Sequence, residues 1–148
     1  MTRILIQRTV STLAVAVPAL ACAVGTSQAK PVKYRCTADR NIVSHYLHVT
    51  VDDEKVSEFS YTAGTPAEES INSCSVDSNV ATVSDTAPGV QSFSTSAGEI
   101  LVTRKGKKFV FDFSKLKVPD LCGQSSTIAK HIAITPGSRR CSDVVNVE

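Results

Sequence analysis

The most constraining feature of the sequence is the segment EILVTRKGKKFVFDF, in which apolar and polar residues alternate on both sides of a Lys-Gly pair. A period of two is typical of β-strands with one buried face, and Gly106 supplies the positive φ that tight hairpin turns need. We expect a β-hairpin with Val102 opposite Phe109. The tip of this hairpin carries four basic residues: Arg104, Lys105, Lys107 and Lys108.

A second hairpin is predicted by LHVTVDDEKVSEFSY, where apolar residues alternate on both sides of an acidic turn. Placing Leu47 opposite Tyr61 brings both apolar sets to the same face of the sheet and leaves a loop at residues 52–56. A shorter loop would set Val49 against the polar Glu58, so we prefer the longer one. The acidic residues of this loop are Asp52, Asp53 and Glu54.

Short strands predominate in the rest of the chain. The further strand candidates are VKYRC, SCSVD, NVATVS, QSFST, IAKHIAIT and CSDVVNV. About eight short strands with tight turns predict an all-β fold, either a small antiparallel β-barrel or a sandwich.

Helix is expected in two short pieces at most. TPAEES offers Thr65 as an N-cap followed by proline, and DFSKLKVPDLC predicts a short turn before Pro119. The pair Pro88 and Gly89 suits the central positions of a type II turn.

The N-terminus has the layout of a secretory signal peptide, because Arg3 and Arg8 precede an uncharged apolar run at residues 10–24. This run is shorter than the roughly 20 residues that span a bilayer, and Pro18 interrupts it. We therefore expect no permanent membrane span.

The cleavage site is indicated by the small residues Ser27 and Ala29. Cleavage after Ala29 makes residues 1–29 a signal peptide and residues 30–148 a single secreted or periplasmic domain. An alternative cleavage would leave Cys22 at the N-terminus, the position acylated in bacterial lipoproteins, but the preceding residues match a lipoprotein motif poorly.

Cysteine parity supports this interpretation. Removal of the signal peptide leaves Cys36, Cys74, Cys122 and Cys141, and an even number in an oxidising compartment predicts two disulfides. Three connectivities are open. We favour pairing in sequence order, Cys36 with Cys74 and Cys122 with Cys141, because it needs only short-range closure. The chain has no Cys-x-x-Cys pair of the kind that binds zinc, so we expect no metal site.

Charge is distributed unevenly along the chain. Residues 41–99 contain nine acidic residues and one basic residue, whereas residues 100–148 contain nine basic and four acidic residues. Two interpretations are open. The opposite charges cancel across one folded sheet, or folding leaves an acidic and a basic face, one of which steers a partner of opposite sign.

Signals for catalysis or cofactor binding are weak. There is no Gly-x-Ser-x-Gly motif, and His45 and His48 lie three apart in a predicted strand, so they point to opposite faces. The phenylalanines beside the basic tip form an inward face, which argues against nucleic-acid binding. We therefore expect no catalytic residue, no cofactor and no nucleic-acid partner.

An exported chain that opens with Tyr34-x-Cys36 and continues as short antiparallel hairpins resembles the periplasmic and membrane-bound inhibitors of c-type lysozyme. The resemblance covers mainly the first strand and the general size. It implies a small eight-stranded barrel that blocks a hydrolase by inserting loops into its cleft. The Ser-Gly-x-x-Tyr type of motif is not found, since the nearest sequence is YTAG, so no inhibitor residue is carried over.

Three classes of function follow from these observations. The first is an exported non-catalytic binding protein whose partner is an extracellular or periplasmic protein, such as a lysozyme or another hydrolase. The second is an envelope-associated or structural protein, and the third and least favoured is a small secreted enzyme. A cationic protein would contact the acidic turn at Asp52, Asp53 and Glu54. Anionic envelope polymer would contact the basic tip at Arg104, Lys105, Lys107 and Lys108.

The mature protein should begin at Lys30, carry no lipid and contain no free thiol. Intact-mass measurement, with and without thiol alkylation under non-reducing conditions, checks this expectation. A mass that includes acylated Cys22, or alkylation of all four remaining cysteines, would contradict it.

Overall fold

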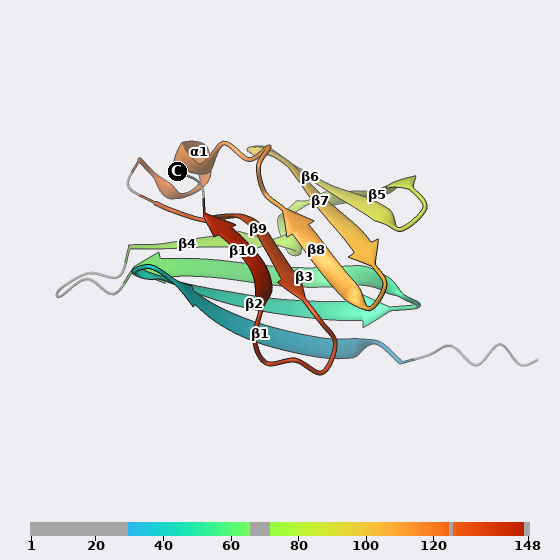
Figure 1. Ribbon diagram of the computed structural model, residues 1–148. Coiled ribbons are helices and arrows are strands. Elements are labelled where there is room, and N and C mark those ends of the chain that lie inside the picture. Colours follow the sequence, from blue (N-terminus) through green and yellow to red (C-terminus); the bar gives the residue numbers. More distant parts are fainter. Residues whose placement is uncertain (1–29, 66–71, 125, 147–148) are drawn as a thin grey trace, which may run out of the picture.

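The computed structural model describes residues 30–65, 72–124 and 126–146. Within this part of the chain, ten strands form two antiparallel sheets that pack face to face as a sandwich (Figure 1). The four-stranded sheet has the order β1 (Val32–Arg40), β2 (Val43–Asp52), β3 (Lys55–Thr65) and β4 (Asn72–Asp77). The six-stranded sheet has the order β10 (Ser142–Asn146), β9 (Ala129–Ile134), β8 (Lys108–Asp112), β7 (Gly98–Lys105), β6 (Val90–Thr95) and β5 (Thr82–Ala87). The expected all-β class is confirmed, and of the two expected architectures the sandwich is the one observed.

The core lies between the sheets and is centred on aromatic side chains. The ring of Phe59 on β3 meets the edges of Phe93 on β6 and Phe111 on β8, with ring centroids 5.1 and 5.2 Å apart. Tyr61 on β3 stacks on Phe113 at 4.7 Å. All five rings are buried, so the alternation of each strand places its apolar face against the opposite sheet.

The β2–β3 hairpin has the expected pairing of Leu47 with Tyr61, but the expected loop at residues 52–56 is wrong. The strands continue to a two-residue turn in which Asp53 and Glu54 have φ of 46° and 65°. A β-bulge at Ser57 takes up the extra residue, so the register changes by one between the turn and the core pairs. Positive φ at both central residues is the conformation of the hairpin turn that matches strand twist.

The β7–β8 hairpin has a different register from the one expected. Val102 lies opposite Phe111 and not opposite Phe109, because the turn is formed by Gly106 and Lys107. The shift is by two residues, which leaves the same side chains facing the core. The expected positive φ of Gly106 is confirmed at 61°.

The disulfides join Cys36 to Cys141 and Cys74 to Cys122, with Cα–Cα distances of 5.0 and 5.2 Å. The expected sequential pairing is therefore wrong. Cys36 lies on β1 and Cys74 on β4, the two outer strands of one sheet, and three strand spacings separate them by about 14 Å. A disulfide needs Cα atoms within about 7 Å, so each cysteine pairs instead with the C-terminal part of the chain.

Helical structure within the described residues is limited to a 3₁₀ turn, η1 (Ser78–Val80), and the helix α1 (Val118–Cys122). The 3₁₀ turn replaces the first half of the expected strand NVATVS. The turn expected before Pro119 is instead a helix that contains it, because proline is tolerated in the first turn. The expected helix at TPAEES lies outside the described residues. Gly89 has the positive φ expected of a type II turn.

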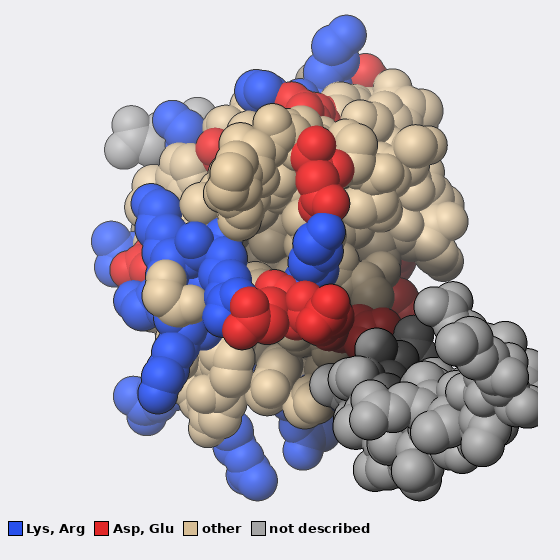
Figure 2. All heavy atoms as spheres, turned by 90° about the vertical axis from the view of Figure 1, so that its right-hand side faces the viewer, with Lys and Arg blue, Asp and Glu red and all other residues tan. Residues whose placement is uncertain are grey.

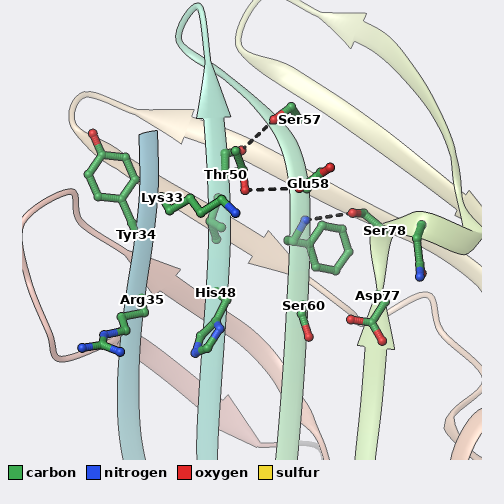
Figure 3. Close-up of a pocket in the computed structure, with 13 residues that line it drawn as sticks. Lys33, Tyr34, Arg35, His48, Thr50, Ser57, Glu58, Ser60, Asp77 and Ser78 are labelled. Atoms are coloured by element: carbon green, nitrogen blue, oxygen red, sulfur yellow. Dashed lines mark hydrogen bonds between the residues drawn. The ribbon is translucent and has the colours of Figure 1, made fainter. Parts of the chain in front are cut away.

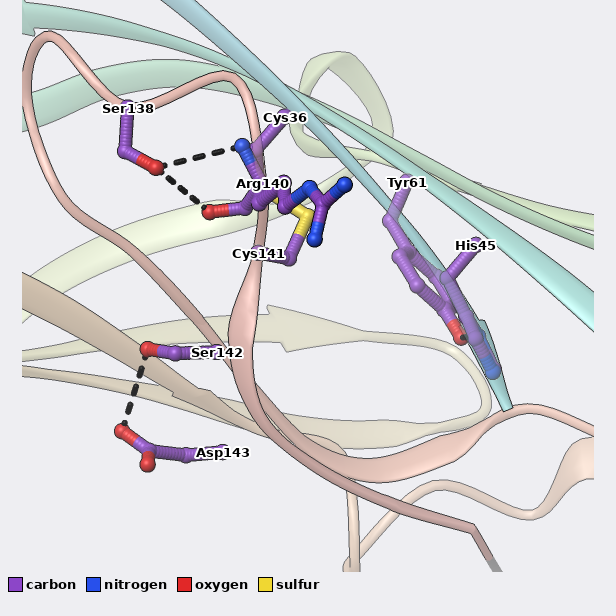
Figure 4. Close-up of a disulfide and its surroundings, with 8 residues drawn as sticks. All are labelled: Cys36, His45, Tyr61, Ser138, Arg140, Cys141, Ser142 and Asp143. Atoms are coloured by element: carbon purple, nitrogen blue, oxygen red, sulfur yellow. Dashed lines mark hydrogen bonds between the residues drawn. A yellow bond between two sulfur atoms is a disulfide. The ribbon is translucent and has the colours of Figure 1, made fainter.

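Polar contacts join the two sheets inside the core. The hydroxyl of Tyr61 accepts a hydrogen bond from the backbone N–H of Ala129 on β9 at 2.7 Å. Within the four-stranded sheet, the same hydroxyl lies 2.8 Å from Nδ1 of His45 on β2 and is hydrogen-bonded to it (Figure 4). On the other side of the core, the side-chain amide of Gln91 on β6 makes two hydrogen bonds to the backbone of Val56 on β3, at 2.8 and 3.0 Å.

Replacing Phe111 by alanine should lower the free energy of unfolding by about 3 to 5 kcal/mol, because a fully buried aromatic ring is lost from the centre of the core. Urea unfolding followed by circular dichroism measures the change. Lys107→Ala at the exposed turn of the same hairpin is the control and should leave the unfolding midpoint almost unchanged. Equal losses in the two variants would contradict the assignment of the inward face.

The stability of the protein should fall as pH drops below about 6.5. Burial lowers the pKa of the His45 imidazole below its ordinary value of 6.5, against weaker opposing effects of Asn146 and the charge of Asp39. Above pH 6.5 neither the folded nor the unfolded chain protonates this ring. Below it the unfolded chain binds a proton first, so stability decreases by at most about 1.4 kcal/mol per pH unit until the folded pKa is reached.

This slope is checked by urea midpoints measured between pH 7.5 and 5.5. The range lies above the pH at which ordinary carboxylates titrate. His45→Phe should be less stable at pH 7.5 but should have a flatter pH profile than the unmodified protein. His48→Gln, which changes an exposed ring on the same strand, should keep the slope. A slope unaffected by His45→Phe would contradict the prediction.

Candidate functional site

The acidic and basic turns identified in the sequence lie together at one end of the sandwich. Figure 2 faces this end, and acidic and basic side chains adjoin there. The turns belong to different sheets, but the guanidinium of Arg104 on β7 reaches Glu54 in the β2–β3 turn and binds both carboxylate oxygens. The second of these contacts, from Nη2 to Oε1, measures 3.0 Å. Glu54 therefore joins the acidic turn to the opposite sheet.

The ion pair shifts the pKa of both of its members. Arg104 holds the pKa of the Glu54 carboxyl below its ordinary value, chiefly through its hydrogen bond, and the pKa of Arg104 is raised in turn. A neighbouring contact, Lys55 Nζ to Asp85 Oδ2 at 2.6 Å, links the same acidic hairpin to β5. Both pairs are exposed to solvent, so salt screens them and they orient the turns more than they stabilise the fold.

The two turns enclose a hollow of about 330 Å³, which we call the tip hollow. Its floor is largely apolar, and its rim is charged. The floor is formed by Val32, Tyr34, Val51, Phe109 and Pro136. The rim is formed by Lys30, Asp53, Glu54, Arg104 and Lys107. Val32 is 48% exposed, so part of this floor is open to a ligand.

The remaining predicted contact residues lie around the same end. Asp52 and Asp53 are exposed beside the ion pair, and Lys105 and Lys107 are exposed on the other turn. Lys108 faces β10 instead and pairs with Asp143 at 3.3 Å. All of the seven predicted residues except Lys108 therefore lie in one mixed-charge region and not on two separate faces. The apolar floor was missed by sequence reasoning, since it combines residues from both sheets.

A second hollow lies on the outer face of the four-stranded sheet and has a volume of about 760 Å³ (Figure 3). We call it the sheet hollow. Four of its side chains stand in one row across the sheet, because Arg35 pairs with His48, His48 with Ser60, and Ser60 with Asp77. Their outward direction follows from the strand alternation that buries their neighbours. The alternation of apolar and polar residues in the sequence therefore indicated which side chains face outward. It did not indicate the strand order that places four of them in one row.

The histidines do not form a catalytic or metal centre with one another. His45 is buried, as expected of the face opposite to His48, and His48 is exposed. His131 lies 3.5 Å from Asp112 at the surface. Within residues 30–65, 72–124 and 126–146, no three His, Cys, Asp or Glu side chains gather closely enough to hold a metal ion.

The site is thus a charged, partly apolar surface suited to binding. None of the helices in the described ranges has the length and apolar character needed to cross a bilayer. The two disulfides fit an extracellular or periplasmic protein, since such bonds persist in oxidising compartments. Comparisons with protein-family models, curated proteins and solved structures gave no match.

Proposed function

We propose that this chain is an exported, non-catalytic binding protein that contacts a protein partner through the tip hollow. The observation that carries the proposal is the joining of two oppositely charged turns by Glu54 and Arg104 around an exposed apolar floor. Protein interfaces combine an apolar centre with a polar rim, and the tip hollow has this arrangement on a small scale.

The chemistry of the floor favours a partner that inserts an apolar side chain. Tyr34, which is partly exposed, offers aromatic contact area, and Val32 at the edge is half exposed. Such a pocket anchors a binding interface when the inserted group is fully desolvated. The charged rim then selects the partner and accelerates encounter more than it adds affinity.

A cationic hydrolase such as a c-type lysozyme is the partner class that we favour. Asp52 and Asp53 are exposed at the turn and make no ion pair with another described residue. Their charges are therefore available for steering a cationic protein toward the hollow. The resemblance to lysozyme inhibitors supports the same class of partner.

An envelope-associated role is the second candidate, and one observation favours it. Lys105 and Lys107 project from the neighbouring turn and form no ion pair with the described residues. They would attach the protein to an anionic envelope polymer by charge alone. This binding would not require the apolar floor.

Asp52→Asn with Asp53→Asn should abolish most capture of a c-type lysozyme by the immobilised mature protein at low salt. Asparagine removes the charge yet tolerates the positive φ of Asp53, and the Glu54–Arg104 pair is left intact. Capture by the unmodified protein should weaken as salt is raised. Bound lysozyme is measured by its lytic activity after elution.

The matched control is Lys105→Gln with Lys107→Gln, which removes two charges from the neighbouring turn. This variant should retain lysozyme capture. Unchanged capture by the aspartate variant would contradict the proposed contact. The envelope role would be favoured by a different pair of results. Purified cell-wall polymer would be captured by every form except the lysine variant, and no form would capture lysozyme.

A further inference from the structure

The sheet hollow separates unpaired charges of opposite sign. Lys33 and Arg35 stand on β1, at one side, and Glu58 on β3 and Asp77 on β4 stand toward the other. No ion pair joins any of these four side chains to another residue in the part of the chain that the structure describes. The sheet hollow is therefore electrically polarised, with basic side chains on the β1 side and acidic side chains on the side of β3 and β4.

The floor between the charges is uncharged and rich in hydrogen-bonding groups. His48 and Thr50 occupy β2, and Ser60 follows on β3 (Figure 3). Thr50 donates a hydrogen bond of 3.4 Å to Glu58, a long contact that leaves most of that carboxylate's acceptor capacity open. Lys33 extends over β2 toward Thr50 and does not close the gap to the acids.

The width of the hollow sets the size of a matching ligand. Two or three strand spacings separate β1 from β3 and β4, a distance of about 10 to 14 Å. An extended peptide covers about 3.3 to 3.6 Å per residue, so three to four residues bridge the two sides. A ligand of this length could place one charged terminus on each side.

We propose that the sheet hollow binds a short zwitterionic peptide of three or four residues, with its carboxylate at Lys33 and Arg35 and its amine at Glu58 and Asp77. The peptide lies across the strands, and its backbone groups meet the imidazole and hydroxyls of the floor. The sheet hollow and the tip hollow share Tyr34 alone among their lining residues, and this proposal does not depend on the function proposed for the tip hollow. A polarised site selects ligands that carry both charges over ligands that carry one.

Amide NMR of the isotope-labelled mature protein, titrated with tetraalanine, tests the proposal. Signals from β1 to β4 around the hollow should shift. Acetylating the amine or amidating the carboxylate of the peptide should each weaken binding about fivefold, the size expected for loss of one exposed charge contact. A doubly capped peptide that binds as tightly as tetraalanine would overturn the proposal.

Paired variants test which charge lies where. In Lys33→Gln with Arg35→Gln, affinity should no longer depend on the peptide carboxylate but should still depend on its amine. In Glu58→Gln with Asp77→Asn, the dependence should be reversed. Lys105→Gln with Lys107→Gln, which changes charge at the turn of β7 and β8, is the control and should keep both dependences.

A second copy of the chain is the competing occupant, since a polarised face is complementary to itself when turned by two-fold rotation. Light scattering decides this point. The peptide proposal would be overturned if the protein forms dimers whose formation shifts the same amide signals without peptide, and if these dimers dissociate in either paired variant. A monomer with peptide-dependent shifts supports it.

Discussion

The fold depends on hydrogen bonds by which buried polar side chains of one sheet reach the backbone of the other. The Tyr61 hydroxyl lies in the core between β3 and β9, where it accepts a hydrogen bond from the Ala129 N–H of the opposite sheet and is also hydrogen-bonded to His45 within its own sheet. An unsatisfied polar group at such a depth costs more free energy than a satisfied pair contributes. Sliding one sheet over the other would break the Tyr61–Ala129 bond, so this bond fixes a relative position of the sheets that apolar packing alone would leave less specific. The Gln91 amide has the same effect at Val56.

The inward faces of the strands could be predicted from the sequence because they depend only on a period of two. A register error of two residues at Val102 left the core face unchanged for that reason. The bulge at Ser57 was missed, although two consecutive polar residues between the inward-facing Val56 and Phe59 break the period of two there. The predicted disulfide pairing was wrong for a different reason. Whether two cysteines meet depends on strand order, which places Cys36 and Cys74 on opposite edges of one sheet.

The charged turns around the candidate site could be identified from the sequence, but their assembly and the apolar floor between them could not. Charge counts along the chain identified the acidic and basic turns, and the structure brings the two together. The hypothesis of cancelling charges describes Glu54 and Arg104, whereas Asp53 and Lys107 remain exposed at the rim. The apolar floor needs contributions from β1, β2 and β8, as well as Pro136, and therefore from segments distant in sequence. Such a surface is a property of the tertiary fold, so it has no signature in any single stretch.

The disulfides are nested, so the outer bond can form only in a chain that extends as far as Cys141. Cys141 follows Cys36 by 105 residues, and the Cys74–Cys122 bond lies inside that interval. In a polypeptide that emerges from its N-terminus, the first two thiols to meet are Cys36 and Cys74, which the finished sheet keeps apart. Correct oxidation must therefore follow strand assembly, with the help of thiol exchange if the early pair forms. A chain truncated before Cys141 would leave Cys36 on β1 without its disulfide partner, so the first strand would lose its covalent link to the C-terminal part of the fold.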